Sequence, residues 1–117
     1  MNNCIFCKIA SGEVRVPRIY ENENFFSIKD AHPKVEGHSL IISKKHFENV
    51  LDMPSSLGTE LIDCVKNTYA KIAKEFKSEG FNIVSNNFKA GGQEVNHVHF
   101  HILPRKEDDR FRIFAKE

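Results

Sequence analysis

The sequence lacks the features that mark several large classes of protein. It has no tryptophan, no long run of basic residues and no apolar run that approaches the length of a membrane span. Its 17 basic and 16 acidic residues give a formal net charge of +1, which disfavours nucleic acid or a membrane as a partner. Because residues 1–9 are too short and too polar for a signal peptide, we expect a cytoplasmic protein.

Cysteine is also scarce, with three residues that cannot form a complete set of disulfides. Cys4 and Cys7 form a Cys-x-x-Cys pair, which in a reducing compartment indicates a metal or a redox role rather than a structural bridge. Cys64 falls on the apolar face of a predicted helix and is most simply a small buried hydrophobic side chain.

What is present suits a single domain over residues 1–117. Hydrophobic residues make up 40% of the chain, enough for a core, and ten phenylalanines supply most of its aromatic bulk. Because a chain of this size buries a modest fraction of its surface, a homodimer interface would help to stabilise it.

Apolar spacing and stop signals predict two helices. A short one covers residues 6–11 and is closed by Gly12. A long one runs from Ser55 or Ser56 to Ser78, with a serine as its cap and Gly80 as its stop.

Five segments read as strands, the last of them ended by Pro104. They are 18–21, 25–29, 39–43, 81–86 and 95–103. Hairpin-scale connections between them predict an α+β fold with a mainly antiparallel sheet. The charged tail, 106–117, contains Phe111, Ile113 and Phe114, which we expect to pack against another surface such as a partner subunit.

Three histidines alternate with apolar residues in the last predicted strand. Because alternate residues of a strand face the same side, His97, His99 and His101 should share one face. The residues between them should then pack on the helix. Imidazole supplies a nucleophile near neutral pH and, when protonated, a cation for phosphate. A metal-binding patch or a polar surface strand is the plainer interpretation of such a row.

This row resembles the signature of the histidine-triad (HIT) family, in particular its Hint-like and bacterial hydrolase branch. Matching motifs span nearly the whole chain. They are Cys4 to Ile9, Asp30, Gly37 to Ile42, Lys44 to His46, Asn86, Gly92 to Val95 and His97 to Arg105. The resemblance implies a HIT-like sheet with one long and one short helix, usually paired into a homodimer.

The resemblance also implies a catalytic centre that cleaves a nucleotide. His99 corresponds to the family's nucleophile, which would attack the α-phosphorus and form a nucleotidyl-histidine that water then hydrolyses. His101 and His38 correspond to ligands of the phosphate oxygens. The backbone N–H groups near Gly92, Gln93 and Glu94 would add donors to the same phosphate.

The nucleoside would lie beside further matching residues. Asp30 resembles the family's ribose-binding acid, and Asn86 resembles an asparagine near the phosphate or ribose. The wall of the base pocket corresponds to five apolar residues, some of which should also be core: Ile5, Phe6, Ile9, Ile28 and Leu40.

A structural zinc site is the expected role of the cysteine pair. Some bacterial members of the family carry a Cys₂His₂ site whose ligands match Cys4, Cys7, His46 and His97. A free dithiol or a disulfide between the cysteines is the alternative. No organic cofactor is expected.

Two comparisons bear on the reaction. Glu94 stands where the phosphoramidase branch commonly has a hydroxyl residue, so either its carboxyl donates a proton or only its backbone N–H is used. His101 is present where the transferase branches carry Gln, which favours hydrolysis. We therefore expect a hydrolase of purine nucleoside phosphoramidates or related adenylyl compounds. The alternatives are a dinucleoside polyphosphate hydrolase, a nucleotide-binding regulatory module and a zinc-dependent adaptor.

Overall fold

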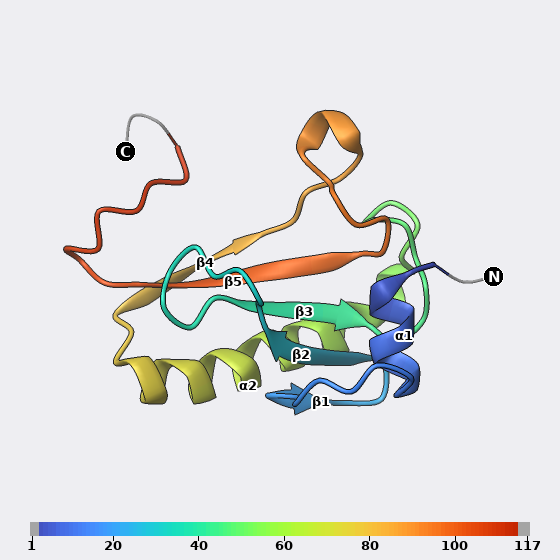
Figure 1. The fold of residues 1–117 in the computed structure, drawn as a ribbon, viewed down its shortest axis with the longest axis horizontal. Helices are drawn as coiled ribbons and strands as arrows, with labels where there is room; N and C mark the ends of the chain where they lie inside the picture. The colour runs from blue at the N-terminus through green and yellow to red at the C-terminus, as the bar shows by residue number, and fades with distance from the viewer. Residues whose placement is uncertain (1–2, 115–117) are drawn as a thin grey trace.

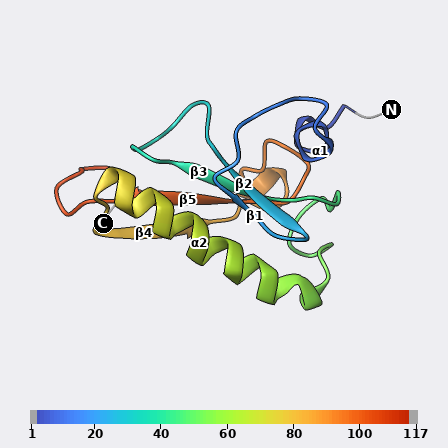
Figure 2. The same ribbon diagram turned by 90° about the horizontal axis from the view of Figure 1, so that it is seen from below.

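The computed structural model describes residues 3–114, which form one five-stranded sheet with helices on both faces. The strand order is β1-β2-β3-β5-β4, and every neighbouring pair is antiparallel. The strands are β1 (Tyr20–Glu21), β2 (Phe25–Lys29), β3 (Ser39–Ser43), β4 (Gly80–Val84) and β5 (His99–Arg105). The long helix α2 (Gly58–Phe76) covers one face, and the short helix α1 (Ile5–Ser11) lies across one end of the other (Figures 1 and 2). The predicted α+β fold is confirmed.

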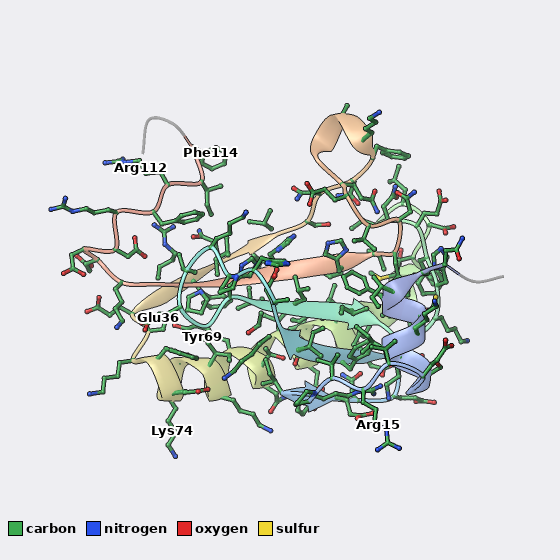
Figure 3. All side chains as sticks on the ribbon, in the orientation of Figure 1. Arg15, Glu36, Tyr69, Lys74, Arg112 and Phe114 are labelled. Atoms are coloured by element: carbon green, nitrogen blue, oxygen red, sulfur yellow. The ribbon has the colours of Figure 1, made fainter. Side chains whose placement is uncertain are left out.

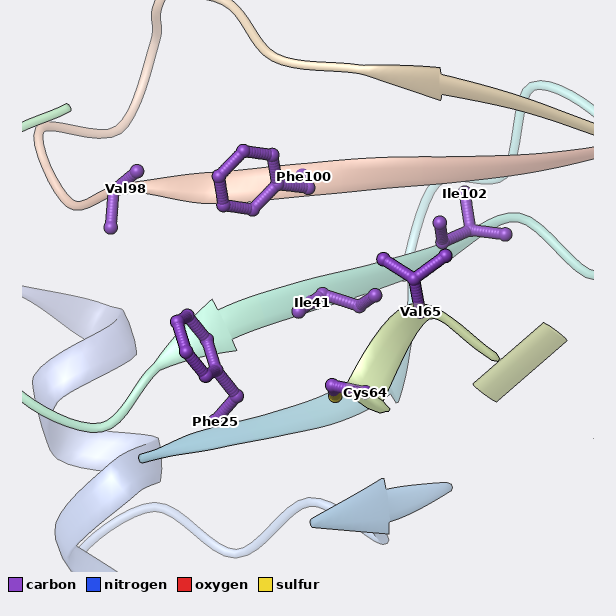
Figure 4. Close-up of a cluster of buried hydrophobic side chains, with 7 residues drawn as sticks. All are labelled: Phe25, Ile41, Cys64, Val65, Val98, Phe100 and Ile102. Carbon is purple, nitrogen blue, oxygen red and sulfur yellow. The ribbon is translucent and has the colours of Figure 1, made fainter. Parts of the chain in front are cut away.

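Each face of the sheet carries its own apolar cluster, because successive residues of a strand point to opposite sides. On the α2 side, Phe25, Ile41 and Phe100 pack against Cys64 and Val65 of the helix (Figure 4). On the α1 side, a second cluster contains Phe6, Ile9, Phe26, Ile28, Leu40 and Ile42. His99 and His101 of β5 lie on the same face as the second cluster, because they pair with its Ile42 and Leu40.

The long helix is shorter than predicted at both ends. Ser55 to Leu57 form a 3₁₀ turn, and no side chain caps the α-helix that follows, so the predicted serine cap is wrong. The helix stops at Lys77, which adopts φ +54°, rather than at Gly80. After this stop, the Ser78 hydroxyl contacts the carbonyl oxygens of Gly80 and Arg105 and so ties the chain to β4 and β5.

Strand β5 ends at Arg105, two residues after its predicted end at residue 103. It contains Pro104, which was predicted to end it. Strand β3 begins at Ser39, which pairs with Ile102, so the residues beyond Ile102 pair only with β4. The missing N–H of Pro104 can therefore face a side that has no neighbouring strand.

The start of β5 also differs, and this changes the histidine row. The strand begins at His99, so His99 and His101 share a face, whereas His97 lies in the preceding turn. The turn is held by the N–H of Val98, which donates to the Phe47 carbonyl oxygen at 2.7 Å. The prediction that all three histidines stand on one strand is therefore wrong for His97.

Other boundaries shift by a few residues. The segment 18–21 forms a strand only over its last two residues, and β4 ends at Val84 rather than at residue 86. Within the tail, Phe111 lies beneath the Arg105 guanidinium at 5.2 Å, whereas Phe114 is 72% exposed (Figure 3). Residues 115–117 of the predicted tail lie outside the described part of the chain. None of the helices within residues 3–114 is long and apolar enough to span a membrane.

Gly37 has the least space for a side chain among the glycines of residues 3–114. Its φ is +81°, and a Cβ there would lie 2.8 Å from Ile72, 2.9 Å from Phe76 and 3.2 Å from Pro104. Gly12 has a similar φ of +86° with no atom within 4 Å of the same position. Both residues need the left-handed conformation, but only Gly37 also needs the space.

We therefore expect Gly37→Ala to lower the free energy of unfolding by about 3 kcal/mol, the sum of backbone strain and overpacking. Gly12→Ala, the matched control, should cost about 1 kcal/mol, since it carries the backbone strain alone. Urea denaturation of both variants measures the difference. Equal losses would contradict the packing argument.

Candidate functional site

His99 is held in one orientation by the backbone. Its Nδ1 lies 2.7 Å from the carbonyl oxygen of His97. Because a carbonyl oxygen only accepts, Nδ1 must carry the hydrogen, and the neutral ring then has its lone pair on Nε2. The ring is 9% exposed and stands roughly perpendicular to that of His101, at 5.2 Å between centroids. The geometry presents a nucleophilic nitrogen of fixed tautomer.

Two further histidines and a carboxylate form a hydrogen-bonded relay beside it. The N–H of Lys34 donates to Nδ1 of His38 at 3.0 Å, so Nε2 of the neutral His38 ring carries the hydrogen. That Nε2 lies 2.9 Å from Nδ1 of His101 and 3.3 Å from Oδ2 of Asp30. If His38 donates along the shorter contact, the hydrogen of His101 is on its own Nε2.

Burial keeps the two histidine rings of this relay uncharged. Desolvation, together with the smaller effects of the neighbouring His99 and His38, lowers the pKa of His101 to about 4. Desolvation also lowers the pKa of His38, although Asp30 opposes the shift. At pH 7 both rings are therefore neutral hydrogen-bond donors and acceptors rather than cations.

This relay revises one predicted role. His38 was expected to contact phosphate oxygens, but it is 3% exposed and both of its ring nitrogens already have protein partners. It supports His101 instead. Asp30, His38 and His101 also lie close enough to hold a metal ion. However, Nδ1 of His38 already accepts a backbone hydrogen, and its Nε2 carries one, so the hydrogen-bonded relay accounts for all three groups without a metal.

The four predicted metal ligands converge at the start of α1. The Sγ atoms of Cys4 and Cys7 and the Nδ1 atoms of His46 and His97 all lie within 4.8 Å of one another. Nδ1 of His97 is 3.2 Å from Cys4 Sγ and 3.2 Å from His46 Nδ1, and Cys7 Sγ is 3.3 Å from His46 Nδ1. Tetrahedral zinc with Zn–N and Zn–S bonds of usual length has ligand atoms about 3.3–3.8 Å apart. The donor set and its spacing fit zinc.

The second ring nitrogen of His97, Nε2, is held by the backbone in a way that favours metal binding at Nδ1. Its Nε2 lies 2.8 Å from the Ser43 carbonyl oxygen, which fixes the hydrogen on Nε2 and leaves the Nδ1 lone pair facing the cysteines. The ring is fully buried, and desolvation lowers its pKa to about 4. The side chain of His97 therefore belongs to the metal-ligand cluster, which consists of Cys4, Cys7, His46 and His97. The carbonyl oxygen of His97 orients the ring of His99.

Three backbone N–H groups of the loop at Gly92, Gln93 and Glu94 were predicted to bind phosphate, and two of them already have partners within the loop. The N–H of Gly92 donates to Lys89 and the N–H of Gln93 to Phe88, both within the loop, so neither is available to phosphate. The Gln93 side chain is also engaged, since its Nε2 donates to the Glu48 carbonyl oxygen at 2.6 Å. Among residues 3–114, the N–H of Glu94 has no hydrogen-bond partner and remains a possible donor.

The expected base-pocket residues fall into two groups. Phe6, Ile9, Ile28 and Leu40 are buried in the α1-side cluster, whereas Ile5 is 43% exposed. A cavity of about 470 Å³ opens beside Ile5, and its lining includes Glu94, Cys4 and His46. Asn86 is half-buried, its side chain lies next to Gly92, and within the described chain it has no hydrogen-bond partner, so its amide is available to a ligand.

Two contributors were missed by sequence reasoning. Lys34 orients His38 through its backbone N–H, and Ser43 orients His97 through its carbonyl oxygen, with its hydroxyl also 3.2 Å from the same ring nitrogen. Backbone contacts leave no residue-type signal, and only the placement of both residues beside predicted site histidines hinted at them.

Comparison with known proteins places the chain in a family. A profile of the HIT domain matches residues 11–108. An uncharacterised HIT-like protein of Methanocaldococcus jannaschii is 45% identical over 91% of this chain and 81% of its own length. The chain belongs to the HIT family.

Other members of the HIT family carry named activities or ligands. The adenosine 5'-monophosphoramidase HNT1 of Saccharomyces cerevisiae is 36% identical over 90% of this chain, which spans 64% of that protein. A zinc-bound histidine triad family protein of Mycobacterium smegmatis is 37% identical, with a TM-score of 0.84, over 95% of this chain and 81% of that one. Some curated HIT relatives are thus nucleotide hydrolases, and a zinc-bound fold of this kind exists.

The lowered pKa of His101 predicts a dependence of stability on pH. Between pH 4 and 6.5 the unfolded chain binds a proton at His101 that the folded chain does not, so the free energy of unfolding falls as the pH drops through this range. His101→Gln should make this dependence shallower by up to about one proton.

Chemical denaturation of the wild type and the variant at several pH values measures this slope. His32→Gln, which removes an exposed histidine outside the relay, is the matched control. Parallel curves for the wild type and His101→Gln would show that burial does not keep this ring neutral.

Proposed function

We propose that the protein hydrolyses purine nucleoside phosphoramidates or related adenylyl compounds through a nucleotidyl-His99 intermediate. The observation that carries the proposal is the 2.7 Å contact between His99 Nδ1 and the His97 carbonyl oxygen, which leaves the Nε2 lone pair for attack. The named activity of the yeast HIT relative supports the choice of substrate class.

In the first step, Nε2 of His99 forms a bond to the α-phosphorus as the bond from phosphorus to the leaving nitrogen breaks. The departing amine takes up a proton, for which the exposed Glu94 carboxyl is the candidate donor. Water then attacks the phosphorus as the bond from phosphorus to His99 breaks, which releases the nucleoside monophosphate and restores the free imidazole. The proton that water loses returns to the Glu94 carboxylate, so the donor is restored as well. Two displacements replace one difficult displacement.

The charge that develops on the phosphate oxygens needs preorganised donors. In the proposed mechanism, Nε2–H of His101 is one donor, since its Nδ1 accepts from His38. The N–H of Glu94 is a second. His38 acts indirectly by holding His101, and Asp30 and Asn86 remain the proposed contacts of the ribose and phosphate.

The base is proposed to lie over the wall formed by Ile5, Ile9, Ile28 and Leu40, with Phe6 at its end. Ile5, at 43% exposed, offers the largest accessible surface among them. The same centre could take a dinucleoside polyphosphate, which differs in its leaving group. Rates for an adenosine phosphoramidate and a diadenosine polyphosphate, measured side by side, separate the two substrates.

His99→Ala should lower kcat by at least about 10³-fold, since no other group can replace the nucleophile. Substrate mixed with the wild type and quenched rapidly should yield a nucleotidylated peptide containing His99, detected by mass spectrometry. His38→Asn, the control, should react more slowly yet label at the same residue.

Tight binding of a nucleoside monophosphate together with turnover unaffected by His99→Ala would favour a nucleotide-binding regulatory module. Label on any other residue would contradict the assignment of the nucleophile.

We also propose that Cys4, Cys7, His46 and His97 bind one structural zinc ion, as the distances among their ligand atoms support. Four protein ligands close the coordination sphere, so the ion would fix α1 to the sheet edge rather than activate water. The site should bring the N-terminal segment and the turn before β5 into one rigid unit.

Cys4→Ser should therefore abolish zinc binding, measured as metal per chain by mass spectrometry after dialysis. Cys64→Ser should retain zinc, because Cys64 is fully buried on α2 and burial raises the pKa of its thiol to about 11. Equal zinc content in both variants would refute the ligand set.

The expected homodimer remains a proposal. Phe81 and Ile83 of the edge strand β4 are 37% and 49% exposed, and Ile62 of α2 is 50% exposed, so both elements offer apolar side chains to a partner. Sedimentation of the purified protein would decide it. The cytoplasmic location stays a prediction.

A further inference from the structure

Phe6 lies against one histidine of each site, namely His99 of the proposed catalytic site and His97 of the metal-ligand cluster. Its ring centroid is 5.0 Å from that of His99, with 72° between the planes, and 5.8 Å from that of His97, with 88° between the planes. Such perpendicular contacts are favourable for aromatic rings. The Phe6 residue is 7% exposed, so its surface is largely taken up by these contacts and the α1-side cluster.

The position of Phe6 depends on the first turn of α1. Cys4 caps this turn by accepting the N–H of Cys7 on its Sγ, at 3.3 Å. The helix has seven residues, and a helix this short is not stable by itself. Contacts made by the turn with the rest of the protein must therefore hold it, and two of the metal ligands sit on either side of Phe6.

We propose that Phe6 is a positioning residue for His99, and that metal binding by Cys4, Cys7, His46 and His97 sets its position. The metal-ligand cluster clamps the turn, the turn places the Phe6 ring, and the ring blocks rotation of the His99 imidazole. The His97 carbonyl oxygen holds one edge of that imidazole, and the Phe6 ring contacts the imidazole from a second direction. This inference rests on the proposed function, in which His99 is the nucleophile.

The role differs from that implied by resemblance, where Phe6 is part of the base wall. A base-wall residue binds the ground state and the transition state alike, so its loss raises KM. A residue that orients the nucleophile contributes to the chemical step, so its loss lowers kcat. The two roles therefore predict different kinetic changes for the same substitution.

Phe6→Leu is the test and Phe26→Leu is its matched control. Phe26 belongs to the same cluster and is fully buried, but within the described residues its ring contacts no histidine ring. We expect Phe6→Leu to lower kcat about tenfold or more, with KM changed less than about twofold. Phe26→Leu should leave both constants within about twofold. A rise in KM with unchanged kcat for Phe6→Leu would overturn the proposal.

A second measurement needs no turnover. The ¹⁵N signals of the His99 ring, recorded in substrate-free protein loaded with zinc, report which nitrogen carries the hydrogen. Phe6→Leu should shift them towards a mixture of the two tautomers, whereas Phe26→Leu should leave them unchanged. Unaltered His99 signals in folded Phe6→Leu would overturn the positioning role.

Removal of zinc from the wild type with a chelator tests the link to the cluster. It should change the His99 signals in the same direction as Phe6→Leu, and it should add little further change in Phe6→Leu itself, since the two perturbations share one path. Unchanged His99 signals after complete zinc removal would overturn the link. If the wild type showed neither turnover nor a His99 adduct, the proposed function would fail, yet the ring signals would still decide whether Phe6 positions His99.

Discussion

The hydrogen bond from His99 Nδ1 to the His97 carbonyl oxygen is the constraint on which the site depends. It selects one tautomer of a ring that otherwise has two, and it joins the nucleophile to a residue whose side chain belongs to the metal-ligand cluster. His97 can serve both partners because the chain turns there before β5 begins.

The fold was predictable where local signals and tertiary packing agree. Strands 25–29 and 39–43 match because their apolar residues are buried on both faces of the sheet. The predictions failed where distant contacts decide the outcome. Pro104 stays in β5 because β3 does not reach it, and the chain after α2 is tied to β5 by the Ser78 hydroxyl, which contacts the Arg105 carbonyl oxygen. In both cases the partner is distant in sequence from the boundary.

The candidate site was predictable as a set of side chains and less so as a set of contacts. Period-two spacing placed His99 and His101 on one face, and the four metal ligands do converge. The relay was not visible, because His38 depends on the backbone of Lys34 and on burial that no motif encodes. The loop amides of Gly92 and Gln93 were misassigned because turn formation uses them first.

The order of the strands has a consequence for synthesis of the protein on the ribosome. Strand β5 lies between β3 and β4 in the sheet although it follows both in the chain. Before it emerges, the growing polypeptide exposes the edge of β3, an unpaired β4 and a helix that lacks Phe100 and Ile102 as apolar partners, which is a hazard for aggregation. Insertion of this strand closes the sheet and brings His99 and His101 beside His38 in a single event, so no partly built chain has a complete relay.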